Sequence, residues 1–174
     1  MKTFRPLFAV AVLVVLLTSC IASAAQHPRS KGLVLPGDIT SDLADIAIKA
    51  AIVEADSQGT LMNIAIVDAG GNLKAFCRMD GAFLGSIDIS QKKAKTARYL
   101  NMPTGTLRDA AQPGEELFGI EVLSDGMVIF GGGELIKDPD GTIIGAIGVS
   151  GSTVANDTAV AKAGAAAILE AMKK

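Results

Sequence analysis

Apolar and polar residues follow two different periods along the chain, which indicates a domain built from both helices and strands. Apolar residues at helical spacing follow Thr40 and continue to about Gly59. Unbroken apolar runs between turn signals are typical of buried strands. The pattern therefore predicts helices over 40–59, 86–100 and 154–172, and a first strand pair over 61–67 and 73–79, joined by a turn at 68–72.

A second hairpin is predicted around the segment Asp-Pro-Asp-Gly at 138–141. Proline suits the second turn position, aspartate bonds its own backbone, and glycine accepts a positive φ. Apolar residues lie on both sides, at 127–130 and 135–136 before the turn and at 142–149 after it. With a short helix from Thr104 through Ala111 and an irregular stretch over 112–126, the order is α-β-β-α-α-β-β-β-α. That order predicts an α+β fold with a mostly antiparallel five-stranded sheet.

Glycines recur at every third residue of the last predicted strand, at Gly145, Gly148 and Gly151. Glycine inside a strand indicates either a closely packed helix or a ligand near the backbone. Residues 150–153 supply capping side chains for the last helix, whose free N–H groups would suit a carboxylate or phosphate. A Walker loop does not fit, because no lysine follows Gly151. A dinucleotide fingerprint does not fit either, because the flanking elements form a hairpin.

The N-terminus has the composition of an export signal. Lys2 and Arg5 precede an apolar run over 7–17 that is too short to span a bilayer. Two processing sites compete: Leu17-Thr18-Ser19-Cys20 resembles a lipobox with Cys20 acylated, and Ala22-Ser23-Ala24 suits ordinary signal peptidase. We favour the lipobox, which predicts a lipoprotein-type signal peptide at 1–20, a tether at 21–38 and a single domain at 39–174. The protein would then be a cell-envelope lipoprotein, or a soluble periplasmic or secreted protein if the second site is used.

Charge and reactive residues exclude several function classes. Without residues 1–20 the chain keeps 14 lysines and arginines against 18 aspartates and glutamates, a balance that attracts neither nucleic acid nor an anionic membrane surface. Cys77 would be the only unmodified thiol, so no internal disulfide is available. The one histidine, His27, lies outside the predicted domain, which argues against a catalytic triad and a structural metal site. Enzymatic activity is left open. Four cations on one predicted helix are most simply a solvated face: Lys92, Lys93, Lys95 and Arg98.

Several motifs together resemble the GlcG/HbpS-like haem-binding family, to which the C-terminal domain of PduO-type corrinoid adenosyltransferases is related. They are Ile-Val-Asp-Ala-Gly-Gly-Asn-Leu at 66–73, Arg-Met-Asp-Gly-Ala at 78–82, Lys-Ala-Lys-Thr-Ala at 93–97, three glycines at 131–133 and Gly-Ala-Ile-Gly-Val-Ser-Gly at 145–151. The resemblance covers about residues 38–172. It implies a profilin-like fold, homo-oligomers and, in some members, haem binding with proposed haem degradation.

The resemblance also implies a set of ligand-binding residues. Arg78 and Lys93 would hold carboxylates such as the haem propionates. Two positions depart from the family pattern: Asn72 stands where many members have histidine, and Leu135 replaces a proline. For haem iron the domain offers Cys77, Met79, Tyr99 and Met102, or His27 from a neighbouring subunit. The full ligand-binding set is Asp68, Arg78, Asp80, Lys93, Thr96, Thr104, Gly148, Ser150 and Gly151.

Three functions from different classes follow. The leading hypothesis is an exported homo-oligomer that binds haem or another anionic ligand, in haem sensing, storage or degradation. The second is an enzyme acting on a small hydroxy or keto acid, with Asp68 or Asp80 as acid/base and Arg78 as the carboxylate clamp. The third is a structural or partner-binding homo-oligomer without a ligand.

Overall fold

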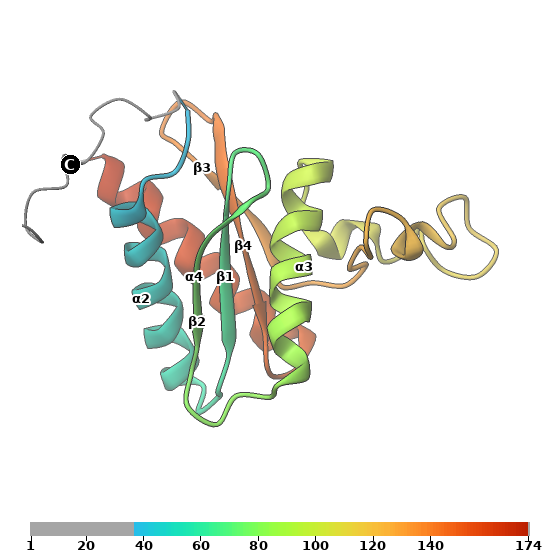
Figure 1. Ribbon diagram of the computed structural model, residues 1–174, viewed down its shortest axis with the longest axis horizontal. Coiled ribbons are helices and arrows are strands. Elements are labelled where there is room, and N and C mark those ends of the chain that lie inside the picture. The colour runs from blue at the N-terminus through green and yellow to red at the C-terminus, as the bar shows by residue number, and fades with distance from the viewer. Residues whose placement is uncertain (1–36, 174) are drawn as a thin grey trace, which may run out of the picture. The chain divides into compact units, whose positions relative to one another are not determined.

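A four-stranded antiparallel sheet lies between two helical layers (Figure 1). The structure is a computed structural model and describes residues 37–173. Within these residues the strand order across the sheet is β2-β1-β4-β3, and every neighbouring pair is antiparallel. The elements are α2 (Ser41–Ser57), β1 (Asn63–Asp68), β2 (Leu73–Arg78), α3 (Gly85–Leu100), η2 (Thr104–Leu107), η3 (Ile120–Val122), β3 (Gly133–Lys137), β4 (Ile143–Ser150) and α4 (Val154–Met172).

Helices α2 and α4 cover one face of the sheet and form the larger core with it. Alanines on α2, among them Ala47 and Ala51, are fully buried together with Ile64 and Ile147 from the strands. Both helices begin at a threonine cap. The backbone N–H of Leu43 donates to Thr40 Oγ1 at 3.3 Å, and a matching bond to Thr153 begins α4. The predicted helices at both ends of the domain are thus confirmed.

Helix α3 covers the other face, where glycines allow it to approach the sheet. A Cβ added to Gly148 would collide with Ser90 O and the Ala94 backbone, and one added to Gly133 would collide with Thr104 and with the backbone carbonyl of Lys93. Gly145 and Gly151 are crowded in the same way by the backbone of β1 and of the residues before it. The spacing of these glycines therefore follows from close packing of backbone against backbone.

Two predicted elements differ in the structure. The short strand near Met127 is not confirmed: residues 127–130 form no ladder, and the described part of the chain has four strands. Val128 N–H donates instead to Thr96 Oγ1 at 3.0 Å, so a side chain takes the place of a neighbouring strand. The predicted helix from Thr104 through Ala111 is a single 3₁₀ turn over Thr104–Leu107. Thr104 does not cap it, because its Oγ1 accepts the N–H of Gly133 at 3.0 Å.

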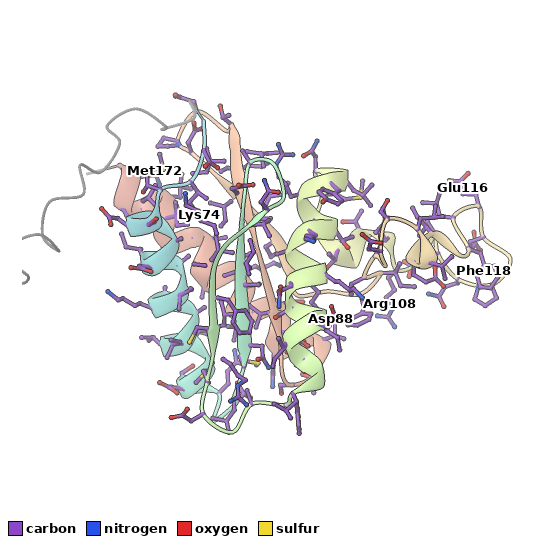
Figure 2. All side chains as sticks on the ribbon, viewed as in Figure 1. Lys74, Asp88, Arg108, Glu116, Phe118 and Met172 are labelled. Atoms are coloured by element: carbon purple, nitrogen blue, oxygen red, sulfur yellow. The ribbon has the colours of Figure 1, made fainter. Side chains whose placement is uncertain are left out.

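Residues 112–126 form an irregular arm that extends away from the sheet (Figure 1). Figure 2 places Glu116 and Phe118 at the far end of this arm. Large apolar side chains are exposed along it, including Phe118, Val122 and Leu123. The arm's last residues turn back towards α3, which brings them to the pocket described below.

The features predicted for the N-terminus lie outside the described residues. These are the signal peptide, Cys20, the alternative site at Ala22-Ser23-Ala24, the tether up to Pro36 and His27. Within residues 37–173, none of the helices combines the length and the hydropathy that a membrane span requires.

Candidate functional site

A pocket of about 310 Å³ opens between α3 and the last residues of the arm. Figure 2 labels Asp88 on the side of α3 nearest to the arm. The helix contributes residues three, four and seven positions apart, which share one face. The full lining is Asp88, Gln91, Lys92, Lys95, Thr96, Tyr99, Ser124, Asp125, Gly126 and Met127.

Of the four charged residues in the pocket lining, one lysine and one aspartate form no ion pair with any of the residues 37–173. Lys92 Nζ lies 2.8 Å from Asp88 Oδ2, one helical turn away, so this lysine is already neutralised. Lys95 is exposed and forms no ion pair with any of the residues 37–173. Asp125 is the only other charged lining residue. Lys95 is therefore the lining cation best placed to receive a carboxylate from a ligand.

Tyr99 is held in the pocket wall by the β1–β2 turn. Gly71 has φ of +82°, and a Cβ at this position would collide with the tyrosine ring. The turn is fixed by Asp68, whose Oδ1 accepts the N–H groups of Gly70 and Asn72, both at 2.8 Å. Burial acts to raise the pKa of Asp68, but the hydrogen bonds from Asn72 and Gly70 outweigh it and lower that pKa below its ordinary value. Asp68 thus positions the ring indirectly.

The opposite wall is formed by the end of the arm, and its backbone is strained. Ser124 and Asp125 have φ of 50° and 64°, and Gly126 has φ of 95°. A left-handed conformation costs a residue other than glycine roughly 1–3 kcal/mol. The wall is anchored just beyond this point by the bond from Val128 to Thr96.

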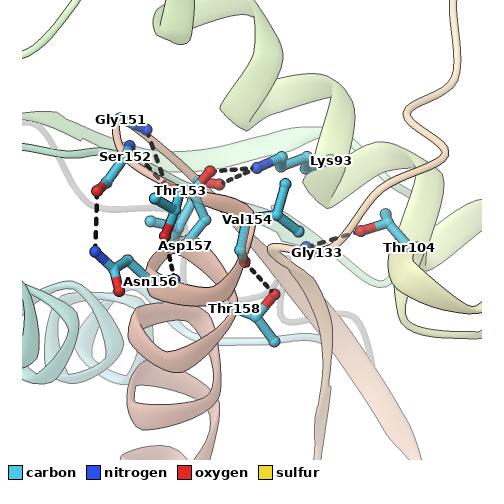
Figure 3. Close-up of polar contacts among 11 residues, drawn as sticks. Lys93, Thr104, Gly133, Gly151, Ser152, Thr153, Val154, Asn156, Asp157 and Thr158 are labelled. Atoms are coloured by element: carbon cyan, nitrogen blue, oxygen red, sulfur yellow. Dashed lines mark hydrogen bonds and ion pairs between the residues drawn. The ribbon is translucent and has the colours of Figure 1, made fainter. Parts of the chain in front are cut away.

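Lys93 is buried in an internal ion pair and does not face the pocket. Its Nζ donates to Asp157 Oδ2 at 2.7 Å and to Val149 O at 2.8 Å, and its side chain has no exposed surface (Figure 3). Burial lowers the pKa of Lys93, and the hydrogen bond and charge of Asp157 partly restore it. The solvated-face interpretation is therefore wrong for Lys93, whereas Lys95 is exposed.

Asp157 also satisfies the N–H groups that were expected to attract an external anion. Its Oδ1 accepts the N–H of Gly151 at 3.2 Å and of Ser152 at 3.0 Å (Figure 3). The N–H groups at the start of α4 thus already bind the carboxylate of Asp157, which also forms an ion pair with Lys93. An anion from solution would have to displace it.

The nine predicted ligand-binding residues do not form one site. Arg78 and Ser150 pair with Asn63 at one end of β1, and Asp68 lies at the other end, roughly 17 Å away at the usual rise per residue. Asp80, Gly151 and a second pocket of about 270 Å³ lie near the Arg78 end. Lys93, Thr104 and Gly148 are interior, and of the nine residues only Thr96 lines the pocket beside α3. Among residues 37–173 no three acidic, cysteine or histidine side chains gather as a metal site.

Comparison with known families identifies the domain. The family model described as "Haem degrading protein HbpS-like" matches residues 39–166. The chain belongs to the HbpS-like family. This confirms the relationship to GlcG and to the C-terminal domain of PduO that the motifs indicated.

Individual relatives show the same relationship. The HbpS-like chain is 36% identical over 112 residues to protein GlcG of Escherichia coli, which covers 64% of this chain and 81% of that protein. It is 35% identical over 146 residues to corrinoid adenosyltransferase PduO of Salmonella typhimurium, covering 84% of this chain but only 43% of PduO. The chain thus spans less than half of PduO. Among solved structures, a PduOC:heme complex superposes with a TM-score of 0.71 at 34% identity, covering 75% of this chain and 94% of that one.

Part of the pocket could not be found from the resemblance. The HbpS-like motifs led to Thr96 and to the turn at Asp68, but not to the arm residues Ser124 and Asp125 or to Met127, which follows the arm. The helical spacing of Asp88, Lys92, Lys95 and Tyr99 was a usable signal, because it places these side chains on one face. The arm gave no comparable signal, since irregular chain has no period.

Proposed function

We propose that this HbpS-like protein binds haem, or another small ligand bearing carboxylates, in the pocket between α3 and the end of the arm. The observation that carries the proposal is the combination of an unpaired cation, Lys95, with the ring of Tyr99 and the side chain of Met127. The description of the family model and the haem in the related PduOC structure support it.

Three of the lining residues match groups that haem offers, and the other seven are polar, charged or glycine. Haem offers two carboxylates, a flat apolar ring and an iron atom. Lys95 would hold a propionate, and Tyr99 and Met127 would contact the ring and offer oxygen or sulfur to iron. The pocket of about 310 Å³ lies at the lower end of the range for small-molecule sites, roughly 300–1,000 Å³. One chain would therefore enclose only part of the ligand. Bound haem would supply an iron centre for oxygen or redox chemistry.

The interpretation as an organic-acid enzyme is less well supported. It required an acidic residue next to the clamp Arg78, and Asp68 lies at the opposite end of β1. The Asp68 carboxylate is also occupied by turn hydrogen bonds that keep it ionised. Asp80 is close to Arg78 in the chain, but both side chains are exposed. We therefore propose ligand binding in the α3 pocket as the function.

We also propose that the protein is a homo-oligomer in which the arm contacts a neighbouring copy. The support is the exposed apolar surface of the arm, where Phe118, Val122 and Leu123 are 61%, 78% and 57% exposed. Replacing Val122 and Leu123 with serine should lower the assembly size measured by sedimentation velocity. A matched pair of serines at Ile46 and Val53 on α2 should leave it unchanged. Equal sizes for all three proteins would contradict the role of the arm.

Export and lipidation remain proposals that rest on the N-terminal sequence. Cleavage before Cys20 with acylation of that cysteine would anchor the domain to the cell envelope. Intact mass of the protein isolated from its host tests this. An unmodified polypeptide beginning near Ala25 would instead indicate the ordinary signal peptidase site.

Titration with hemin tests the proposed function. The purified protein should shift and sharpen the Soret band of hemin in a saturable way, with a stoichiometry of one haem per pocket or per pair of pockets. A parallel thermal-shift panel of small hydroxy and keto acids separates the alternatives. Stabilisation by such acids without any response to hemin would replace haem by a small organic acid as the ligand. No response to either would contradict ligand binding in this pocket.

A further inference from the structure

We propose that the pocket beside α3 binds a small zwitterion, a molecule that carries both a carboxylate and a cationic amine. The inference rests on the ligand binding proposed for this pocket and narrows the class of ligand. Lys95 would receive the carboxylate from the helix side, and Asp125 would receive the amine from the arm side. The choice follows from which polar groups of the lining are already bonded within the protein and which are not.

Most polar side chains that α3 contributes to the lining have an internal partner. Lys92 and Asp88 form an ion pair at 2.8 Å. Gln91 Nε2 donates to a backbone carbonyl one turn back along α3, at 3.3 Å. Thr96 Oγ1 accepts the N–H of Val128 at 3.0 Å. These groups shape the wall, and a ligand gains little from them because an internal bond would have to be given up.

The two charges that remain are opposite in sign and belong to opposite walls. Lys95 lies on α3, and Asp125 lies near the end of the arm. Neither side chain forms an ion pair or a hydrogen bond with any of the residues 37–173, and the two do not pair with each other. A ligand that bears both signs could therefore meet both residues without breaking an internal contact.

The arm holds Asp125 in a tight turn. The N–H of Gly126 donates to Leu123 O at 2.9 Å, and the N–H of Met127 donates to Glu121 O at 2.9 Å. Asp125 itself has a φ of 64°, a left-handed conformation that aspartate adopts more readily than most residues. A charged group on a backbone that is fixed before binding costs less conformational entropy to use.

The size and polarity of the pocket favour the same class of ligand. Its volume of about 310 Å³ is near the lower limit for small-molecule sites, roughly 300 Å³. Among the ten lining residues, only Tyr99 and Met127 have aromatic or apolar side chains. Such a pocket suits a polar molecule with a short carbon skeleton. Hemin would use only the Lys95 half of this arrangement, because it carries no cation for Asp125.

A matched set of probes tests the pairing of charges. The full-length protein is screened by thermal shift and calorimetric titration with the protein amino acids and with ω-amino acids from β-alanine to ε-aminocaproate. Each zwitterion that binds is compared with its analogue lacking the amine and its analogue lacking the carboxylate. For γ-aminobutyrate these analogues are butyrate and propylamine. We expect the zwitterion to bind at least about fivefold more tightly than either analogue.

Single substitutions assign the two ends of the ligand. Asp125→Asn should weaken binding of the zwitterion by about fivefold or more and should not weaken binding of the amine-free analogue. Lys95→Gln should weaken both. Asp140→Asn is the matched control, because Asp140 occupies the same position in a tight turn closed by the bond from Gly141 N–H to Asp138 O at 3.0 Å, and it does not line the pocket. The melting temperature of each variant without ligand shows whether folding is intact.

The outcomes separate this inference from the function on which it rests. If Asp125→Asn binds the zwitterion as tightly as the wild type does, Asp125 is not its partner and the inference fails. The inference also fails if the amine-free analogues bind as tightly as the zwitterions. If hemin or small hydroxy acids bind in a way that depends on Lys95 and no zwitterion binds, the inference fails and the proposed function stands. If no probe binds, both fail.

Discussion

At the residue scale, the side chains that resemblance selected as ligands build the structure around the pocket. Thr96 and Thr104 each accept a backbone N–H from the segment that leads into β3. Lys93 joins α3 to β4 and α4. Asp68 shapes the turn that lies against the ring of Tyr99. Of these four residues only Thr96 lines the pocket, and the other three support the structure around it, so the presence of a residue in a motif does not distinguish the two roles.

Removing the Lys93 ammonium should be costly, because Asp157 would remain buried without its partner. Both side chains are almost fully buried, at 0% and 3% exposure. Breaking a buried ion pair from one side typically costs about 3–5 kcal/mol. Lys93→Met should lower the free energy of unfolding by that amount in urea denaturation. Lys92→Met removes an exposed pair and should change it by less than about 1 kcal/mol. Equal effects of the two substitutions would contradict the account.

The Asp68 turn should make part of the stability depend on acid pH. The pKa of Asp68 in the folded protein is lowered from its ordinary value of 3.8. Its contribution is therefore fully present above pH 3.8 and is lost as pH falls through the lower folded pKa. The difference in unfolding free energy between wild type and Asp68→Asn should be constant near neutral pH and shrink below pH 3.8. If this difference in unfolding free energy did not change between pH 7 and pH 2, the folded protein would not favour the ionised form of Asp68.

At the scale of elements, helices and hairpins were predictable where local chemistry decides them. Thr40 and Thr153 cap their helices, and Asp138 fixes its turn by accepting two backbone N–H groups. Elements that depend on distant partners were not predictable. Residues 127–130 have the sequence pattern of a strand, but the backbone N–H of Val128 donates to Thr96 Oγ1 instead of to a neighbouring strand. Lys93 has the sequence pattern of a surface residue, because the partner that buries it, Asp157, lies 64 positions later in the chain.

The glycines under α3 should not tolerate even one added methyl group. A Cβ at Gly148 would meet the backbone of α3 at Ser90 and Ala94, which cannot rotate away as a side chain could. Gly148→Ala should therefore destabilise the fold by about 1–3 kcal/mol or more. Gly85→Ala is the matched control, because a Cβ there meets nothing and the residue begins a helix. It should be neutral or slightly stabilising. Thermal unfolding of both variants measures the contrast.

At the scale of the whole molecule, the α3 pocket lies where the ordered layers end and the arm begins. The family and the broad α+β architecture followed from the motifs and their order. The position of the pocket did not, because one of its walls is irregular chain whose course depends on tertiary contacts. The predicted ligand residues at the Arg78 end and at the Asp68 end also lie too far apart for a single small ligand.

The central claim is that the ligand binds in the α3 pocket, and one comparison of hemin affinities tests it most directly. Lys95→Glu reverses the unpaired charge of the pocket, and Lys49→Glu makes the same change at an exposed position on α2. The account predicts that Lys95→Glu weakens hemin binding by roughly tenfold or more, since a like charge opposes the propionate, and that Lys49→Glu matches the wild type. Equal hemin affinities for the two variants would contradict the placement of the site.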